Sequence, residues 1–329
     1  MIDSPEAKFA VAAVREAAQL VRRVQAEMVT DALEKGDKSP VTVGDFTAQA
    51  VIARRLQDNF PGVKLVGEES AADLREEAGT ETLEQVTHFV RMVLPHATAE
   101  EVCDWIDFGT ADAEGEYWTL DPIDGTKGFL RGDQYAVAFA LIKDGQVQVA
   151  ALGCPELADA TSPAKGGDGS VLLAAKGQGA RCQSMADPSA EWKPLSTSDL
   201  SDPAGARVLR SVEKGHTNMG QIDYFAEALG ITADPVGMDS QAKYAVLAAG
   251  GGEMLLRLMS PKMPDYQERI WDQAAGSLVI TEAGGRVTDL DGRPLDFSHG
   301  RTLAQNRGVL ATNGPLHDAA LEALKSVGA

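Results

Sequence analysis

The beginning of the chain places apolar residues at the spacing of amphipathic helices. Six apolar residues share one side of the first helix: Val14, Ala17, Ala18, Val21, Val24 and Met28. We expect Ser4 to cap this helix and the helix to end near Gly36, because Ser and Gly are typical residues at the two ends of helices. A second helix is expected from Asp45 to about Asn59.

Two short apolar segments that follow predict strands with acidic residues at their ends. Residues 64–66 lead to Glu68 and Glu69, and residues 117–120 lead to Asp121. Short runs of β-branched and aromatic residues are typical of strands. Carboxylates are therefore expected where two strands end.

The rest of the chain continues with mixed patterns of helix and strand. The expected elements are a β-hairpin of strands 135–142 and 147–152 that turns at Asp144 and Gly145, helices 241–250 and 271–283, and strands 254–258 and 285–288. The stretch 159–170, rich in Ala, Gly, Ser and Pro, indicates a boundary. We expect a layered α/β protein with an α+β N-terminal domain over residues 1–160 and an α/β C-terminal domain over residues 161–329.

Composition excludes several classes of partner. The chain has 329 residues, of which 44% are hydrophobic and 24% charged, as is typical of a globular enzyme. Its formal net charge of −19 argues against nucleic-acid polymers and anionic membranes, which bind to Lys and Arg surfaces. Neither a long apolar run nor a secretion signal is found, so we expect a cytoplasmic protein. Three widely spaced cysteines, Cys103, Cys154 and Cys182, are expected to be reduced and mostly buried.

The run DPIDGT at residues 121–126 carries the most specific chemistry. It places Asp121 and Asp124 three positions apart, with Pro122 restricting one φ angle and Gly125 permitting an unusual backbone conformation. A rigid set of carboxylate and carbonyl oxygens suits Mg²⁺, which demands octahedral oxygen ligands. Taken alone, the run is also typical of an ordinary surface turn.

Three further acidic positions favour the metal site over the turn. Glu68 follows a strand, Asp272 precedes an apolar helix in WDQAAG, and Asp45 begins another helix. Asp45 or Asp272 alone would be interpreted as a helix cap. Their combination with DPIDGT is harder to explain without a shared site.

In this order and spacing, GEES, DPIDGT and WD-x-AAG resemble the lithium-sensitive superfamily of the inositol monophosphatases. The resemblance extends over residues 5–325 and is stronger to its 3′(2′),5′-bisphosphate nucleotidases. These share LDPIDGTKGFLRG at 120–132, VEKGH at 212–216, DSQAKY at 239–244 and the segment 270–276. Inositol monophosphatases typically carry Thr and Asn where this chain has Lys127 and Gly128, and they lack the DSQAKY run.

The resemblance implies a fold, a reaction and a set of site residues. The implied fold is an αβαβα sandwich, and the reaction is hydrolysis of 3′-phosphoadenosine 5′-phosphate to AMP and phosphate, which would clear a by-product of sulfate transfer. The implied ligands of two or three Mg²⁺ ions are Glu68, Asp121, the Ile123 carbonyl, Asp124 and Asp272. Asp45 and Thr126 would act on the attacking water. The implied substrate-binding residues are Thr126, His216, Ser240, Lys243, Arg257 and Asp272.

The residues also leave alternatives open. Arg257 could be a strand residue that pairs with an acid, and His216 a surface residue. Gln273 stands where the family often has His beside Asp272, and the stretch 261–265 is longer than usual. Neither a dinucleotide fingerprint nor a P-loop is present. An inositol monophosphatase and a catalytically idle nucleotide sensor remain alternative functions. The protein is expected to be a monomer or a homodimer.

Overall fold

The computed structural model describes residues 2–27, 33–34, 40–41, 43–212, 219–259, 263 and 265–329. Its α-helices, in chain order, are α1 (Pro5–Glu27), α2 (Val43–Asn59), α3 (Thr80–Val90), α4 (Ala99–Asp107), α5 (Thr126–Arg131), α6 (Met219–Ala228), α7 (Ala242–Ala248), α8 (Ala274–Glu282) and α9 (His317–Ser326). Short 3₁₀ turns lie at Asp73–Arg75, Glu77–Gly79 and Pro203–Gly205.

The larger sheet has seven strands. They are β3 (Leu65–Gly67), β4 (Glu116–Asp124), β5 (Ala136–Lys143), β6 (Gln146–Cys154), β9 (Ser170–Ala175), β10 (Ala180–Ser184) and β11 (Lys193–Pro194), arranged in the order β11-β10-β9-β6-β5-β4-β3. Only β3 and β4 are parallel. The hairpin β5–β6 turns at Asp144 and Gly145, both with positive φ, which confirms the predicted tight turn.

The smaller sheet has five strands. They are β12 (Val208–Arg210), β13 (Val236–Gly237), β14 (Met254–Arg257), β15 (Arg286–Thr288) and β16 (Val309–Thr312), arranged in the order β13-β12-β14-β16-β15. Two further pairs join β1 (Leu33–Glu34) to β2 (Pro40–Val41) and β7 (Leu157–Ala158) to β8 (Ser162–Pro163). The expectation that the first helix reaches Gly36 is wrong, because Leu33 pairs with Val41 in a strand; the apolar helical spacing stops at Met28.

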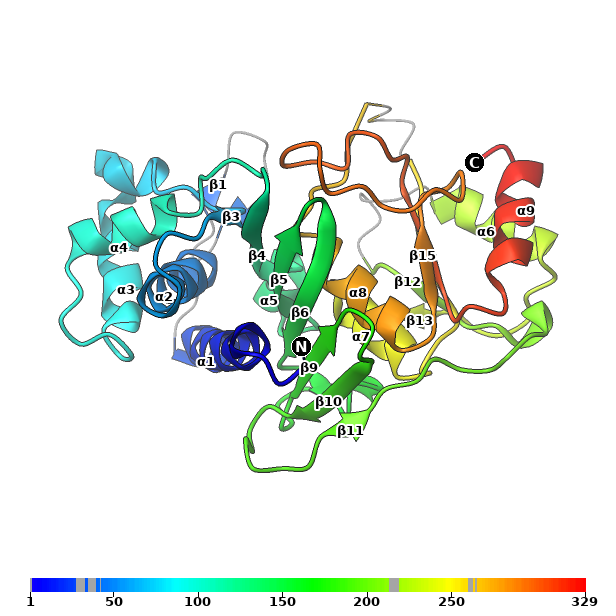
Figure 1. The fold of residues 1–329 in the computed structure, drawn as a ribbon, viewed down its shortest axis with the longest axis horizontal. Coiled ribbons are helices and arrows are strands. Elements are labelled where there is room, and N and C mark those ends of the chain that lie inside the picture. The colour runs from blue at the N-terminus through cyan, green and yellow to red at the C-terminus, as the bar shows by residue number, and fades with distance from the viewer. Residues whose placement is uncertain are drawn as a thin grey trace.

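The elements form five layers, as Figure 1 shows. Helices α1 and α2 pack on one face of the seven-stranded sheet, and α7 and α8 fill the space between the two sheets. Helices α6 and α9 cover the outer face of the smaller sheet, while α3 and α4 pack against α2. The αβαβα layering predicted from the sequence is confirmed.

The change from one sheet to the other lies later than the expected boundary. The large sheet continues to Pro194, and the small sheet begins at Val208. The division into domains at residues 160 and 161 therefore stays a prediction. Cys103, Cys154 and Cys182 are buried free thiols, as expected.

Among the described helices, none has the length and apolar character that crossing a membrane requires.

Candidate active site

The first four residues of the DPIDGT run, Asp121–Asp124, extend strand β4 instead of forming the surface turn that the run taken alone would suggest. β4 continues to Asp124, and its register with β5 shifts between Asp121 and Asp124, so that two β4 residues oppose one residue of β5. Such a bulge fits Pro122, which cannot donate a hydrogen bond to the sheet. Both carboxylates are consequently fixed to the sheet itself.

The chain turns sharply after this strand. Gly125 adopts φ 89°, and a Cβ atom there would lie 2.8 Å from the Cβ of Ser240. Helix α5 then begins at Thr126, whose hydroxyl donates a hydrogen bond to the Ile123 carbonyl at 3.2 Å. Glycine is thus required both for its conformation and for the close approach of Ser240.

The DSQAKY run, residues 239–244, lies directly against these carboxylates. The Gln241 backbone N–H donates to Asp124 Oδ2 at 2.5 Å. Burial raises the pKa of Asp124, while the charge of Lys243 and the Gln241 N–H act against that rise. Burial in turn lowers the pKa of Lys243 to about 8, although Asp124 opposes this shift. Two segments more than 100 residues apart, which the sequence assigned to metal and substrate, therefore meet.

The predicted carboxylates interact strongly with one another. Asp121 is only 2% exposed, and its Oδ1 atom accepts no hydrogen bond from the residues that the structure describes. Burial, followed by the charges of Glu68, Asp124, Asp272 and Asp45, raises the pKa of Asp121 well above its ordinary value. Asp272, in the turn before α8, is shifted in the same direction, first by burial and then by Asp124 and Glu68. Four elements thus contribute acidic side chains to one electrostatic cluster.

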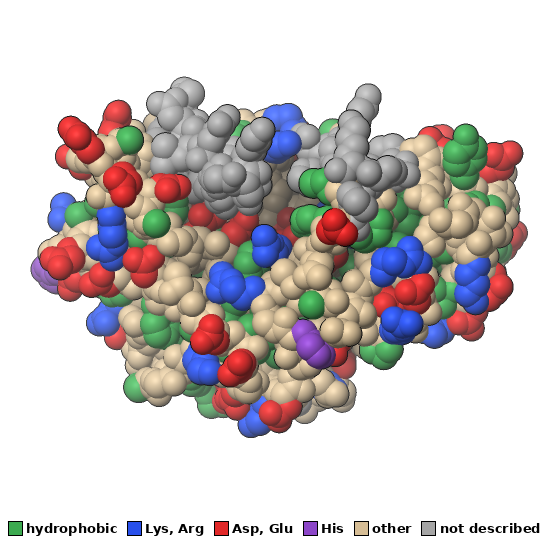
Figure 2. All heavy atoms as spheres, turned by 90° about the horizontal axis from the view of Figure 1, so that it is seen from above, with side chains coloured by type: hydrophobic (Ala, Val, Ile, Leu, Met, Phe, Trp, Pro, Cys, Tyr) green, Lys and Arg blue, Asp and Glu red, His purple; other side chains and the backbone are tan. Residues whose placement is uncertain are grey.

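We tested whether this cluster fits a metal ion. As the described side chains stand, no three His, Cys, Asp or Glu residues are arranged to hold one. The chemistry of the cluster nevertheless fits a hard cation, because it offers only oxygen atoms and includes a buried carboxylate oxygen without a donor. Figure 2 shows Asp and Glu side chains at the middle of one face, with Lys or Arg side chains beside them.

The family of the chain follows from comparison with known proteins. The model of the inositol monophosphatase family matches residues 3–329. The chain belongs to the inositol monophosphatase family. It is thus an enzyme of a phosphatase family.

Curated relatives within this family resemble the chain over nearly its full length. The proteins named 3′(2′),5′-bisphosphate nucleotidase of Schizosaccharomyces pombe and Emericella nidulans are each 42% identical to it. Each alignment covers 98% of this chain, with 95% and 98% of the respective relative. A rice protein of the same name is 39% identical over 95% of this chain and 91% of its own length.

Solved structures of the family share the fold at lower identity. An IMPase of Thermotoga maritima has a TM-score of 0.66 at 19% identity and covers 99% of this chain and 98% of its own. The extragenic suppressor protein suhB of Bartonella henselae has a TM-score of 0.67 at 19% identity, covering 98% and 99%. These similarities support the αβαβα fold of this family member.

The cationic side of the site is organised around Arg257 at the end of β14. Its Nε and Nη2 atoms donate to the Glu268 carboxylate at 3.3 and 3.1 Å, so the pairing with an acid that the sequence left open is present. Gln273 donates to the same carboxylate at 2.7 Å and accepts a hydrogen bond from the Tyr244 hydroxyl. The side chain of Gln273, next to Asp272 in the sequence, therefore bonds to Tyr244 and to Glu268, the partner of Arg257.

One predicted contact cannot be placed. His216 lies outside the residues that the structure describes, as does most of the stretch 261–265. Their predicted roles remain predictions.

The sequence reasoning missed an arginine that spans the site. Arg301 follows β15, and its guanidinium donates to the carbonyls of Gly67 and Gly109 and lies 4.9 Å from the Trp271 ring centroid. Gly67 precedes Glu68 and Trp271 precedes Asp272, so one cation contacts the backbone or ring beside two predicted ligands. Nothing local in the sequence marks Arg301, because its partners lie far away along the chain.

A second group near the site was also missed. Asp239 is buried and accepts hydrogen bonds from Arg131 at 2.5 Å, Ser211 at 3.1 Å and the Val212 N–H at 3.0 Å. It ties the end of α5 to the end of β12. Its place at the start of DSQAKY was the signal that could have identified it.

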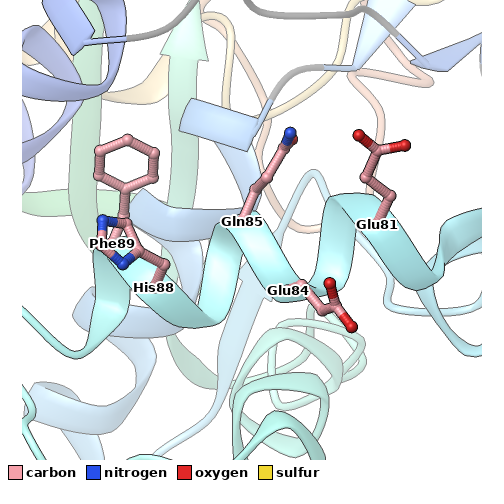
Figure 3. Close-up of a pocket in the computed structure, with 5 residues that line it drawn as sticks. All are labelled: Glu81, Glu84, Gln85, His88 and Phe89. Carbon is pink, nitrogen blue, oxygen red and sulfur yellow. The ribbon is translucent and has the colours of Figure 1, made fainter.

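A groove of about 380 Å³ on the surface of α3 is separate from this site. It is lined by Glu81, Glu84, Gln85, His88 and Phe89. Figure 3 shows these side chains projecting from successive turns of the one helix. None of the predicted site residues lines it.

Proposed function

We propose that the protein is a Mg²⁺-dependent 3′(2′),5′-bisphosphate nucleotidase that hydrolyses 3′-phosphoadenosine 5′-phosphate to AMP and phosphate. The observation that carries this proposal is the 2.5 Å hydrogen bond from Gln241 to Asp124. It joins the run that resembles nucleotidases, rather than inositol monophosphatases, to the run that resembles the phosphatase metal site. The names of the curated relatives support the same reaction.

The acidic side of the site is proposed to hold two or three Mg²⁺ ions. The ligands would be Glu68, Asp121, the Ile123 carbonyl, Asp124 and Asp272. When bound, the ions would lower the pKa of a water molecule and stabilise the developing negative charge. The raised pKa of Asp121 supports this assignment, since a buried anion among anions is relieved by a cation.

Asp45 and Thr126 are proposed to orient the attacking water. Asp45 is buried in the first turn of α2, and Thr126 begins α5 directly after the metal-site strand. The water oxygen forms a bond to phosphorus while the bond from phosphorus to the ribose 3′-oxygen breaks. The water passes one proton to the Thr126 hydroxyl, which gives its own proton to the Asp45 carboxylate, and the leaving oxygen takes up a proton from solvent, so no phospho-enzyme is formed.

The nucleotide is proposed to bind on the cationic side. Its contacts would come from Thr126, His216, Ser240, Lys243, Arg257 and Asp272. Lys243 and Arg257 supply positive charge beside the acidic cluster of a protein whose net charge is −19. A bisphosphate needs such local cations, because the protein as a whole repels it.

Phosphate release from a panel of substrates tests the proposal. The panel comprises 3′-phosphoadenosine 5′-phosphate, its 5′-phosphosulfate analogue, inositol 1-phosphate and fructose 1,6-bisphosphate, each with and without Mg²⁺. We expect Mg²⁺-dependent release with the highest kcat/KM on the adenosine bisphosphates, inhibited by LiCl but not by KCl at equal ionic strength. A preference for inositol 1-phosphate would favour an inositol monophosphatase, whose fold the solved structures share. No turnover of any substrate would favour a nucleotide sensor.

A further inference from the structure

A buried chain of hydrogen bonds runs from α7 to the end of β14. The Tyr244 hydroxyl donates to Gln273 Oε1, and Gln273 Nε2 donates to Glu268 Oε2 at 2.7 Å. Glu268 then accepts two hydrogen bonds from Arg257. Tyr244, Gln273 and Glu268 are 3%, 1% and 7% exposed, so water has little access to these bonds.

The middle position in this series of hydrogen bonds requires a side chain that donates one hydrogen bond and accepts another. Burial raises the pKa of Tyr244, which keeps its hydroxyl a donor, while Glu268 presents only acceptor oxygens to its cationic partner. The amide of Gln273 satisfies both neighbours with one planar group. A carboxylate there would face the Glu268 carboxylate, and an apolar side chain would leave the buried Tyr244 hydroxyl without its acceptor and would remove one of the donors to Glu268 Oε2.

Glu268 fixes the plane of the Arg257 guanidinium. It engages Nε and Nη2, whereas no described residue accepts a hydrogen bond from Nη1. A guanidinium held on one edge presents its remaining donors in a set direction. Its neighbours in the site include Lys243 and Asp272, whose pKa values respond to its charge. Arg257 is thus held rigidly at the edge of the acidic cluster with a donor to spare.

We propose that Glu268 and Gln273 are positioning residues that orient Arg257 toward an anionic group of the nucleotide remote from the reacting phosphate. The inference rests on the proposed nucleotidase function. It assigns Gln273 to substrate recognition instead of to the metal ligand beside it. Tyr244 completes the chain by fixing the orientation of the Gln273 amide.

The first test separates substrate recognition from chemistry. Gln273→Met keeps the size of the side chain but removes both hydrogen bonds, and Glu268→Gln keeps the shape but removes the charge. Each variant is expected to raise the KM for 3′-phosphoadenosine 5′-phosphate about tenfold and to weaken AMP binding in calorimetry similarly. The kcat/KM for p-nitrophenyl phosphate should change less than twofold, since that substrate lacks the remote group. Equal losses on both substrates would overturn the proposal.

Gln183 on β10 provides a matched control. It is 7% exposed, donates to the carbonyls of Pro188 and Ala190, and accepts a hydrogen bond from Arg15. Gln183→Met therefore removes a comparable buried amide outside the site. It is expected to lower the melting temperature as Gln273→Met does, without changing the KM for the nucleotide. A similar rise in KM in both variants would show that loss of stability explains the effect, and would contradict the proposal.

A double-mutant cycle tests whether Gln273 acts through Arg257. Once Arg257→Ala has removed the guanidinium, adding Gln273→Met should cause no further loss on the nucleotide. If the loss in the double variant equalled the product of the two single-variant losses, the proposal would be overturned.

The single variant Gln273→His should lose less affinity for the nucleotide than Gln273→Met, because a neutral imidazole also offers one donor and one acceptor. If the wild type failed to bind AMP or to hydrolyse the nucleotide, the proposed function itself would fail, independently of the cycle.

Discussion

The two sides of the site treat buried charge in opposite ways. On the acidic side, Asp121 is buried and Asp272 half-buried among other carboxylates, and the pKa of each is raised well above its ordinary value. On the cationic side, Arg257 is paired with Glu268, whose second partner is Gln273. The first arrangement leaves Asp121 Oδ1 without a donor among the described residues, whereas the second gives the Glu268 carboxylate donors from both Arg257 and Gln273.

This difference indicates what each side requires. Burying a charge is costly unless a partner offsets the lost hydration. Among the described residues no donor reaches Asp121 Oδ1, so the chemistry of the acidic side is expected to depend on an external cation. The cationic side is already organised and is expected to contribute selectivity. Substitutions on the two sides should therefore change activity and stability in different ways.

The largest effect is expected from the acidic side. Asp121→Asn should reduce phosphate release to below about one thousandth of the wild-type rate, because a metal ligand is lost. The metal-free variant should unfold at the same or a higher temperature, since an ionised carboxylate with a raised native pKa destabilises the fold at neutral pH. Initial rates and thermal unfolding in EDTA measure the two effects.

Asp289 is the control for this prediction. It is fully buried, but accepts hydrogen bonds from the Asp291 and Arg293 N–H groups and from Asn306. Asp289→Asn should lower the unfolding temperature and leave the metal requirement unchanged. If Asp121→Asn behaved like Asp289→Asn, the acidic side would be a structural cluster.

Removing a cation should cause a smaller and more selective loss. Lys243→Ala and Arg257→Ala are each expected to reduce kcat/KM for 3′-phosphoadenosine 5′-phosphate about tenfold to hundredfold, the equivalent of a charge-assisted hydrogen bond of about 1.5 to 3 kcal/mol. Steady-state kinetics on this substrate and on p-nitrophenyl phosphate separate the two roles. A uniform loss on both substrates would remove the distinction between the two sides.

Arg301 contacts Gly67 and Trp271 beside two predicted metal ligands and should have an intermediate phenotype. Arg301→Lys keeps the charge but cannot bond to several carbonyls in one plane, so we expect the Mg²⁺ concentration for half-maximal activity to rise several-fold. Calorimetric Mg²⁺ titration should show the same weakening without substrate. Arg15 is a buried arginine that also donates to carbonyls, those of Ser184 and Met185, outside the site. A matching rise in the Mg²⁺ concentration for half-maximal activity of Arg15→Lys would contradict a specific role for Arg301.

The smallest effect on activity is expected from His317, whose contribution is to stability alone. His317 is fully buried between the Thr288 and Thr312 hydroxyls, each 3.0 Å away, and burial lowers its pKa to about 4. The unfolded chain binds a proton below a pH of about 6.5 while the native state resists it, so the free energy of unfolding should fall between about pH 6.5 and pH 4.

The loss should be on the order of 3 kcal/mol from this group, because its pKa differs by about 2.5 units between the two states and each unit is worth about 1.4 kcal/mol. Denaturant unfolding of the wild type and of His317→Gln across this pH range measures the contribution. An unchanged pH dependence in His317→Gln would rule out His317 as the source.

The sequence predicted features carried by local patterns better than those formed by long-range contacts. Helical spacing identified α1 and α2, and Asp144-Gly145 identified the hairpin turn, because these depend on neighbouring residues. The resemblance named Asp124, Lys243 and Arg257, which prove to interact. The bulge that carries the DPIDGT run and the pairing of Leu33 with Val41 depend on partner strands, and spacing alone did not reveal them.

The supporting residues were harder to predict for the same reason. Arg301 contacts Gly67 from 234 positions away, and Gln273 contacts Tyr244 from 29 positions away. Their residue types are ordinary in their local context. Only the folded arrangement of the layers gives them their proposed roles.

The identity of the product formed from 3′-phosphoadenosine 5′-phosphate tests the central claim most directly. With Mg²⁺ present, chromatography and phosphate assay should find AMP and phosphate in equal amounts, and EDTA should abolish both. Formation of adenosine 3′-phosphate, or no turnover of this substrate by an enzyme that hydrolyses inositol 1-phosphate, would contradict the account.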